Sequence, residues 1–185
     1  MKQTLRRKVL VVCLGNPDRG DDGVGLLVAK KLAGLLPTDV AIASLSGDIL
    51  SLMADWAGFD AMICIDAAAP LTAPGRIHRV DLATSELPRN LSPGSSHALG
   101  LADAIALARV LQTAPRDIMI YAVEGAAFNS GVPMTPEVAA AVDEVAACVV
   151  ADVVRLQQSA GLEKDRGLPA ARTLSRPPSG ISQRA

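Results

Sequence analysis

Residues 8–25 read KVLVVCLGNPDRGDDGVG and join an uninterrupted apolar run to a loop of glycine and aspartate residues. The run Val9–Leu14 is typical of a strand that is buried on both faces of a parallel sheet. From Val24 to Leu36 the apolar residues recur at helical spacing, and Pro37 follows as a stop signal. A buried strand, a loop and a helix in this order indicate an α/β fold. Residues 15–25 are called the acidic loop below.

The rest of the chain continues to alternate strand-like and helix-like segments. We expect strands at 40–45, 61–66, 75–81 and 117–123, helices at 49–56, 97–112 and 135–157, and a loop at 85–96. Pro74-Gly75 and the polar composition of 75–81 place that strand at an edge. The prediction is a three-layer α/β/α domain whose twisted, mostly parallel, mixed sheet has about five strands.

Composition separates a single α/β domain, residues 1–157, from a tail, residues 158–185. The 185 residues fit the size of one domain. The tail is rich in Pro, Gly, Ser and Arg and has few apolar residues, so we expect it to be disordered. The apolar run before Gly15 is too short for a secretory signal, and no segment has the length of a membrane-spanning helix.

Charge, aromatic content and cysteine usage exclude several partners. A net charge of −1 and only four aromatic residues argue against a nucleic-acid or membrane partner. The three cysteines form no CxxC pair, so we expect buried, inert, reduced thiols and a cytoplasmic protein. Nothing in the chain demands a dimer, and a monomer is compatible with it.

The acidic loop does not have the spacing of a nucleotide-binding loop. It lacks both GxGxxG and GxxxxGK[ST], and its carboxylates would repel a phosphate. A nucleotide- or phosphate-binding α/β enzyme is therefore the less favoured alternative. Asp21 and Asp22 cannot both cap the helix that follows, so we expect Asp21 to be the cap or a structural partner and Asp22 to face a ligand.

Two further candidates are expected beyond the carboxyl ends of the strands. Asp66 ends an apolar strand, where it needs either loop N–H groups or a functional partner. His97 opens a helix, as a packing residue or a ligand, whereas His78 lies among charged residues and is expected to be exposed. Asp22, Asp66 and His97 together would make an O,O,N site that suits Zn²⁺ or Ni²⁺ with open positions.

The motifs of the folded part resemble the hydrogenase maturation endopeptidases. The resemblance is carried by Leu14-Gly15-Asn16 with Gly20–Gly25, Ile65-Asp66-Ala67 with Pro74-Gly75, Ser96-His97, Val123-Glu124-Gly125, and Met134–Val138. It spans residues 8–157 in the order of the family. It implies a twisted mixed sheet flanked by helices, and it places the three metal-contacting positions on Asp22, Asp66 and His97.

The resemblance also implies an activity. Such proteins remove a short C-terminal peptide from the precursor of a [NiFe] hydrogenase large subunit after nickel has been inserted. Nickel would then be supplied by the precursor rather than held permanently by the protease. Asp22, Asp66 and His97 would either recognise that nickel or act as an aspartic-type pair that His97 orients. A metal-binding scaffold with the same fold and no proteolysis is a further alternative.

Overall fold

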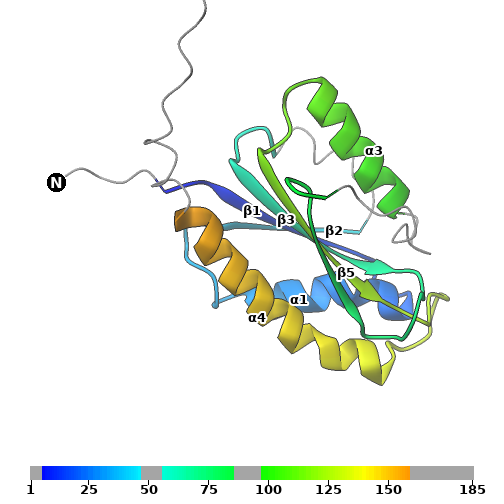
Figure 1. Cartoon of the computed structure of the whole chain (residues 1–185). Coiled ribbons are helices and arrows are strands. Elements are labelled where there is room, and N and C mark those ends of the chain that lie inside the picture. Colours follow the sequence, from blue (N-terminus) through cyan, green and yellow to red (C-terminus); the bar gives the residue numbers. More distant parts are fainter. Residues whose placement is uncertain (1–5, 47–55, 86–96, 159–185) are drawn as a thin grey trace, which may run out of the picture.

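A computed structural model shows a sheet flanked by helices (Figure 1), and its described residues form five strands and three longer helices. The structure describes residues 6–46, 56–85 and 97–158, without the side chains of residues 97–100. The expected helix at 49–56 falls almost wholly outside the described residues, as do most of the 85–96 loop and the tail. The elements are β1 (Val9–Leu14), the short 3₁₀ helix η1 (Gly20–Gly23), α1 (Val24–Leu32), β2 (Ala41–Leu45), β3 (Ala61–Ala68), β4 (Ile77–Asp81), α3 (His97–Val110), β5 (Asp117–Glu124) and α4 (Pro136–Gln158).

The strands form one mixed sheet in the order β2-β1-β3-β5-β4. All neighbouring pairs are parallel except β4 with β5, which is antiparallel. The expected five-stranded, mostly parallel sheet with an edge strand after Pro74-Gly75 is therefore confirmed. Crossovers through helices bury both faces of β1, β3 and β5, which is why most residues of these strands are apolar.

Two hydrophobic cores lie on opposite faces of the sheet. Odd-numbered residues of β1, β3 and β5 pack with α1 and α4, while even-numbered residues of these strands pack with α3. Figure 1 shows α1 and α4 on one side of the sheet and α3 on the other. The three-layer arrangement is therefore confirmed, and the parity of a strand residue tells which layer its side chain meets.

Two elements differ in length from the sequence expectation. Helix α1 ends at Leu32 rather than at Leu36, because the backbone leaves the helical region at Ala33 and Gly34 has a φ of +90°. Strand β3 continues to Ala68, because Ala67 and Ala68 pair with the last residues of β5. Asp66 consequently lies inside the strand and does not end it.

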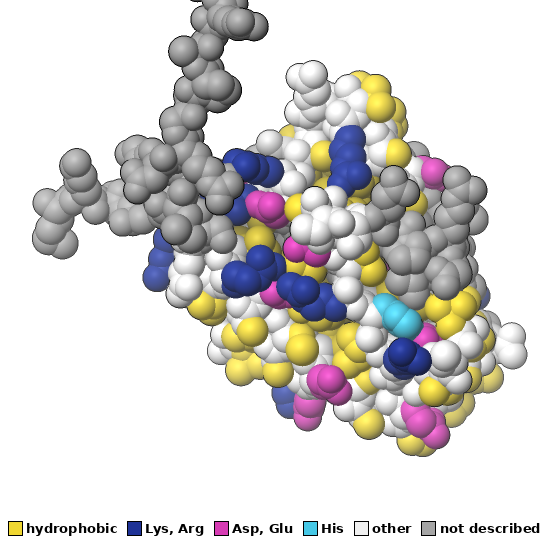
Figure 2. Space-filling view, viewed as in Figure 1, with side chains coloured by type: hydrophobic (Ala, Val, Ile, Leu, Met, Phe, Trp, Pro, Cys, Tyr) yellow, Lys and Arg dark blue, Asp and Glu magenta, His cyan; other side chains and the backbone are white. Residues whose placement is uncertain are grey.

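An ion-pair cluster around the buried carboxylate of Asp152 ties β4 and β5 to α4. Arg79 binds the Asp152 carboxylate through two hydrogen bonds of 2.8 Å, and the Tyr121 hydroxyl donates to it at 2.5 Å. Burial alone would raise the pKa of Asp152, but these bonds and one from Arg155 lower it to about 2. On the face seen in Figure 2, basic and acidic side chains are mixed. No helix within the described ranges is long and apolar enough to cross a membrane.

Gly25 lets α1 approach the sheet more closely than any other residue would. A Cβ at this position would lie 2.1 Å from the carbonyl oxygen of Leu14 and 2.9 Å from that of Ile65. We therefore predict that Gly25→Ala lowers the free energy of unfolding by about 3 kcal/mol or more, since neither strand backbone can move aside. Chemical denaturation measures the change. Gly58→Ala is the matched control, because open space surrounds Gly58; equal stability of the two variants would contradict the prediction.

Candidate active site

The acidic loop folds back tightly on the end of β1. Gly15 has a φ of +140°, and a Cβ there would lie 1.9 Å from the carbonyl oxygen of Asp22. Only glycine permits both the conformation and the contact. The loop therefore returns directly over its own start, which brings η1 and its two aspartates to the carboxyl edge of the sheet.

Asp21 fastens the acidic loop to the segment between β5 and α4. Its carboxylate accepts hydrogen bonds from the backbone N–H groups of Ala126, Ala127 and Thr135, and from the Thr135 hydroxyl. Burial raises its pKa, but these bonds outweigh burial and hold the pKa below its usual value. The expected structural role is confirmed. The expected helix cap is wrong, since neither η1 nor α1 has a side-chain cap.

Asp22 is buried, and no described residue forms a hydrogen bond with its carboxylate. Its side chain is 0% exposed, and both oxygens lack a hydrogen-bond partner within the described part of the chain. Arg19 supplies an opposite charge, with its Nη1 3.8 Å from Oδ2. A carboxylate placed in this way is costly to the free protein and keeps acceptor capacity for a ligand.

Asp66 is the second buried carboxylate with unused acceptor capacity. It is 3% exposed, Oδ1 accepts the N–H of Ala67 at 2.8 Å, and Oδ2 has no partner in the segments that the structure describes. Burial raises its pKa to about 8, with a smaller contribution from the charge of Asp22 and an opposing one from the Ala67 N–H. Asp22 and Asp66 therefore lie within electrostatic reach of each other.

His97 is the first residue of α3, and its side chain lies outside the described part of the structure. The even-numbered residues of β3, Met62 and Cys64, face α3, so Asp66 belongs to the same face. The structure therefore brings Asp22 and Asp66 together and places Asp66 on the sheet face covered by the helix that His97 begins. Among the residues with described side chains, no group of three metal-binding side chains occurs.

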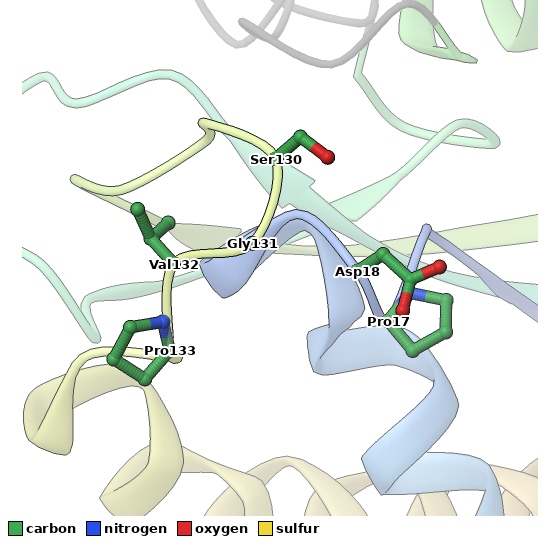
Figure 3. A pocket seen from close by; sticks show the side chains of 6 residues that line it. All are labelled: Pro17, Asp18, Ser130, Gly131, Val132 and Pro133. Carbon is green, nitrogen blue, oxygen red and sulfur yellow. The ribbon is translucent and has the colours of Figure 1, made fainter.

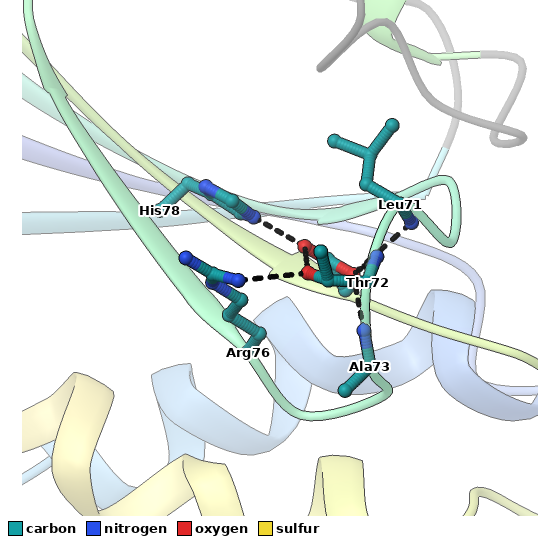
Figure 4. Close-up of polar contacts among 6 residues, drawn as sticks. Leu71, Thr72, Ala73, Arg76 and His78 are labelled. Atoms are coloured by element: carbon teal, nitrogen blue, oxygen red, sulfur yellow. Dashed lines mark hydrogen bonds and ion pairs between the residues drawn. The ribbon is translucent and has the colours of Figure 1, made fainter.

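A third buried carboxylate, Glu124, has its hydrogen bonds satisfied (Figure 4). It accepts the N–H groups of Leu71, Thr72 and Ala73, the Thr72 hydroxyl, and His78 Nε2 at 2.5 Å. Burial raises its pKa, but these bonds hold it far below the usual range. The expectation that His78 is exposed is wrong: the ring is 24% exposed and paired with Glu124.

Glu124 was not among the predicted site residues, although its position in the sequence could have indicated a buried carboxylate. Like Asp66, it is a carboxylate in an apolar strand that is buried on both faces. The structure separates the two: Glu124 orders the segment after β3, whereas Asp66 keeps a free oxygen.

The cysteines do not contribute nucleophiles. Burial raises the pKa of Cys13 to about 12 and raises that of Cys64 still further, so neither forms a thiolate near neutral pH. Cys148 is half-buried, so the expectation of three fully buried thiols is wrong for this residue. The chemistry of the described site thus rests on carboxylates, which suit proton transfer or a cation with oxygen ligands.

An open hollow of 560 Å³ adjoins the acidic loop (Figure 3). Gly131 donates its N–H to the carbonyl of Asp18 at 2.7 Å, which joins the two loops that form it. The lining residues are Pro17, Asp18, Ser130, Gly131, Val132 and Pro133. The hollow therefore lies between the acidic loop and the segment that precedes α4.

The fold is similar to that of several solved structures, three of which are hydrogenase maturation proteases. The hydrogenase maturating endopeptidase HybD from E. coli is 25% identical, with 80% of this chain and 93% of that chain covered and a TM-score of 0.67. The [NiFe] hydrogenase maturation protease HybD from Thermococcus kodakarensis is 21% identical, with 79% and 99% covered and a TM-score of 0.64. The HycI protease of T. kodakarensis KOD1 is 19% identical, with 81% and 94% covered and a TM-score of 0.64.

A family model described as hydrogenase maturation protease matches residues 27–152. The matched segment includes Asp66 and His97 and begins five positions after Asp22. A comparison with curated proteins found no match. The family match spans more than half of the chain and agrees with the fold, so the protein is a peptidase that belongs to the hydrogenase maturation protease family.

Proposed function

We propose that the protein removes a short C-terminal peptide from the nickel-loaded precursor of a [NiFe] hydrogenase large subunit. The observation that carries the proposal is the pair of buried carboxylates, Asp22 and Asp66, which have three oxygens without a hydrogen-bond partner among the described residues. Carboxylate oxygens with such unused capacity suit either a cation presented by a substrate or the protons of peptide hydrolysis. In this proposal nickel belongs to the substrate, and His97 is its third ligand beside the two carboxylates.

For the cleavage step we propose an aspartic-type pair. With a pKa of about 8, Asp66 is mainly protonated near neutral pH and can donate a proton. Asp22, paired with Arg19, is the carboxylate that takes a proton from the attacking water. The two carboxyl groups thereby divide the roles of acid and base. His97, at the start of α3, would orient them or hold the nickel.

The hollow beside the acidic loop supports a docking role. Its walls come from the acidic loop and from residues 130–133, which are joined by the Asp18–Gly131 hydrogen bond. We propose that these loops contact the precursor and select the cognate hydrogenase, together with the segment 85–96. We further propose that the protein acts as a monomer in the cytoplasm, because one chain supplies all three site residues and its cysteines are unpaired.

The first test is cleavage by variants of the proposed site. Asp22→Asn, Asp66→Asn and His97→Ala are each expected to lower the rate of precursor processing by about 100-fold or more, because each removes a proton-transfer group or a nickel contact. Mass spectrometry of a nickel-loaded precursor measures the loss of its C-terminal peptide. Absence of any mass loss with the wild-type protease and its cognate precursor would refute the proposed function.

The dependence of cleavage on nickel loading distinguishes proton transfer by Asp66 from metal binding by Asp66. If Asp66 transfers a proton, raising the nickel loading of the precursor leaves Asp66→Asn inactive. If Asp66 only binds the metal, high loading restores part of the activity. We expect no restoration, since the raised pKa of Asp66 suits an acid better than a metal ligand.

The unpartnered Asp66 should also cost stability in a pH-dependent way. Its pKa is about 8 when folded and about 3.9 when unfolded, so the folded protein binds the additional proton and loses stability as pH rises between these values. The free energy of unfolding of Asp66→Asn, relative to wild type, should therefore rise by about 1.4 kcal/mol per pH unit between about pH 5 and 7. Urea denaturation in metal-free buffer measures it.

Asp21→Asn is the matched control. The Asp21 carboxylate is stabilised by its hydrogen bonds, so its contribution is complete above its unfolded pKa and is lost only in acid. This variant should be less stable than wild type by about 1.5–3 kcal/mol, with no slope over the same pH range. A flat difference for Asp66→Asn would contradict the predicted proton uptake.

A further inference from the structure

We infer that Arg19 is a further catalytic residue, which donates hydrogen bonds to the carbonyl oxygen of the peptide bond that is cut. The inference rests on the proposed peptidase function of Asp22 and Asp66. It concerns a residue for which neither the sequence motifs nor the family resemblance suggested a role.

The backbone and an anchor on a second loop hold Arg19 in place. Its N–H donates to the carbonyl of Asn16 at 3.2 Å, and its own carbonyl accepts the N–H of Asp22 at 3.1 Å. Its Nε donates to the carbonyl of Phe128 at 3.1 Å. The side chain therefore spans from the acidic loop to the segment after β5, and the guanidinium has a defined position.

The guanidinium keeps most of its donors free. Nε is occupied by Phe128, whereas Nη1 lies 3.8 Å from Asp22 Oδ2, which is beyond hydrogen-bond distance. No hydrogen bond from Nη1 or Nη2 to any other described residue is present. The side chain is 31% exposed while that of Asp22 is 0% exposed. Arg19 is therefore the member of this ion pair that a substrate can contact from solvent.

The site requires such a cation. Asp22 and Asp66 can move protons, but their negative charge opposes the charge that develops on a carbonyl oxygen during hydrolysis. Among the described residues, Arg19 is the cation that forms an ion pair with a site carboxylate. A planar guanidinium with spare N–H groups is well suited to bind an oxyanion.

Hydrolysis proceeds through an attack by water and two proton transfers. Asp22 accepts a proton from water as the water oxygen bonds to the carbonyl carbon, and the electron pair of the C=O bond moves to the oxygen that Arg19 binds. The C=O bond then re-forms, the C–N bond breaks, and the leaving nitrogen takes a proton from Asp66. The products are a carboxylic acid and an amine, and the proton held by Asp22 returns to Asp66. Arg19 stays protonated throughout.

The test compares Arg19→Gln with wild type in processing of the nickel-loaded precursor. We expect kcat to fall by about 100- to 1,000-fold, as for other oxyanion donors, with KM changed by less than about threefold. Arg109→Gln is the matched control, because Arg109 is exposed and also donates to a backbone carbonyl, that of Leu82 at 3.2 Å, away from the site. It should process the precursor at the wild-type rate.

Several results would overturn the inference. They are a kcat for Arg19→Gln within threefold of wild type, or a loss that appears only in KM. If Arg19→Gln does not fold in a thermal melt, Arg19→Lys decides: a lower kcat at unchanged KM supports the inference, and wild-type kcat overturns it. Failure of the proposed function is distinguishable, because wild type and Arg109→Gln would then both leave the precursor intact.

Discussion

The backbone around Asp22 and Asp66 excludes water from both carboxylates and offers them few hydrogen-bond donors. The site depends on this constraint. Gly15 closes the acidic loop against the carbonyl of Asp22, and Gly25 brings α1 against Leu14 and Ile65. A looser loop would let water reach the carboxylates and return the pKa of Asp66 toward its ordinary value. The close packing thus opposes stability locally while it creates the groups that can react.

Asp21 and Asp22 show how adjacent residues of one type can take opposite roles. Asp21 receives donors from the segment before α4, so its charge is stabilised and the loop is held. Asp22 receives no hydrogen bond from the described residues and forms an ion pair with Arg19. Because Asp21 holds the loop in place, Asp22 can contact a substrate without loosening the loop.

Much of the fold could be predicted because its strands are buried on both faces. The apolar runs at 9–14, 61–66 and 117–123 each became a central strand, and Pro74-Gly75 marked the edge. The side-chain pairings that the sequence did not predict are contacts between distant segments. A sequence shows that Asp66 and Glu124 are carboxylates in apolar strands, but only the structure shows that 71–73 turns its N–H groups toward Glu124. The pairings of His78 and Asp152 were missed for the same reason.

The contrast between Glu124 and Asp66 explains why burial alone does not identify a catalytic carboxylate. Both lie in neighbouring strands, and by parity both belong to the face that α3 covers. Glu124 is held ionised by its donors and is therefore a poor proton carrier, whereas Asp66 has one donor and a raised pKa. Asp66 and Glu124 therefore differ in how far the described residues satisfy the hydrogen-bonding capacity of their carboxylates. By the same criterion, the free N–H groups of Arg19 mark it as a residue that completes the site only when a substrate is bound.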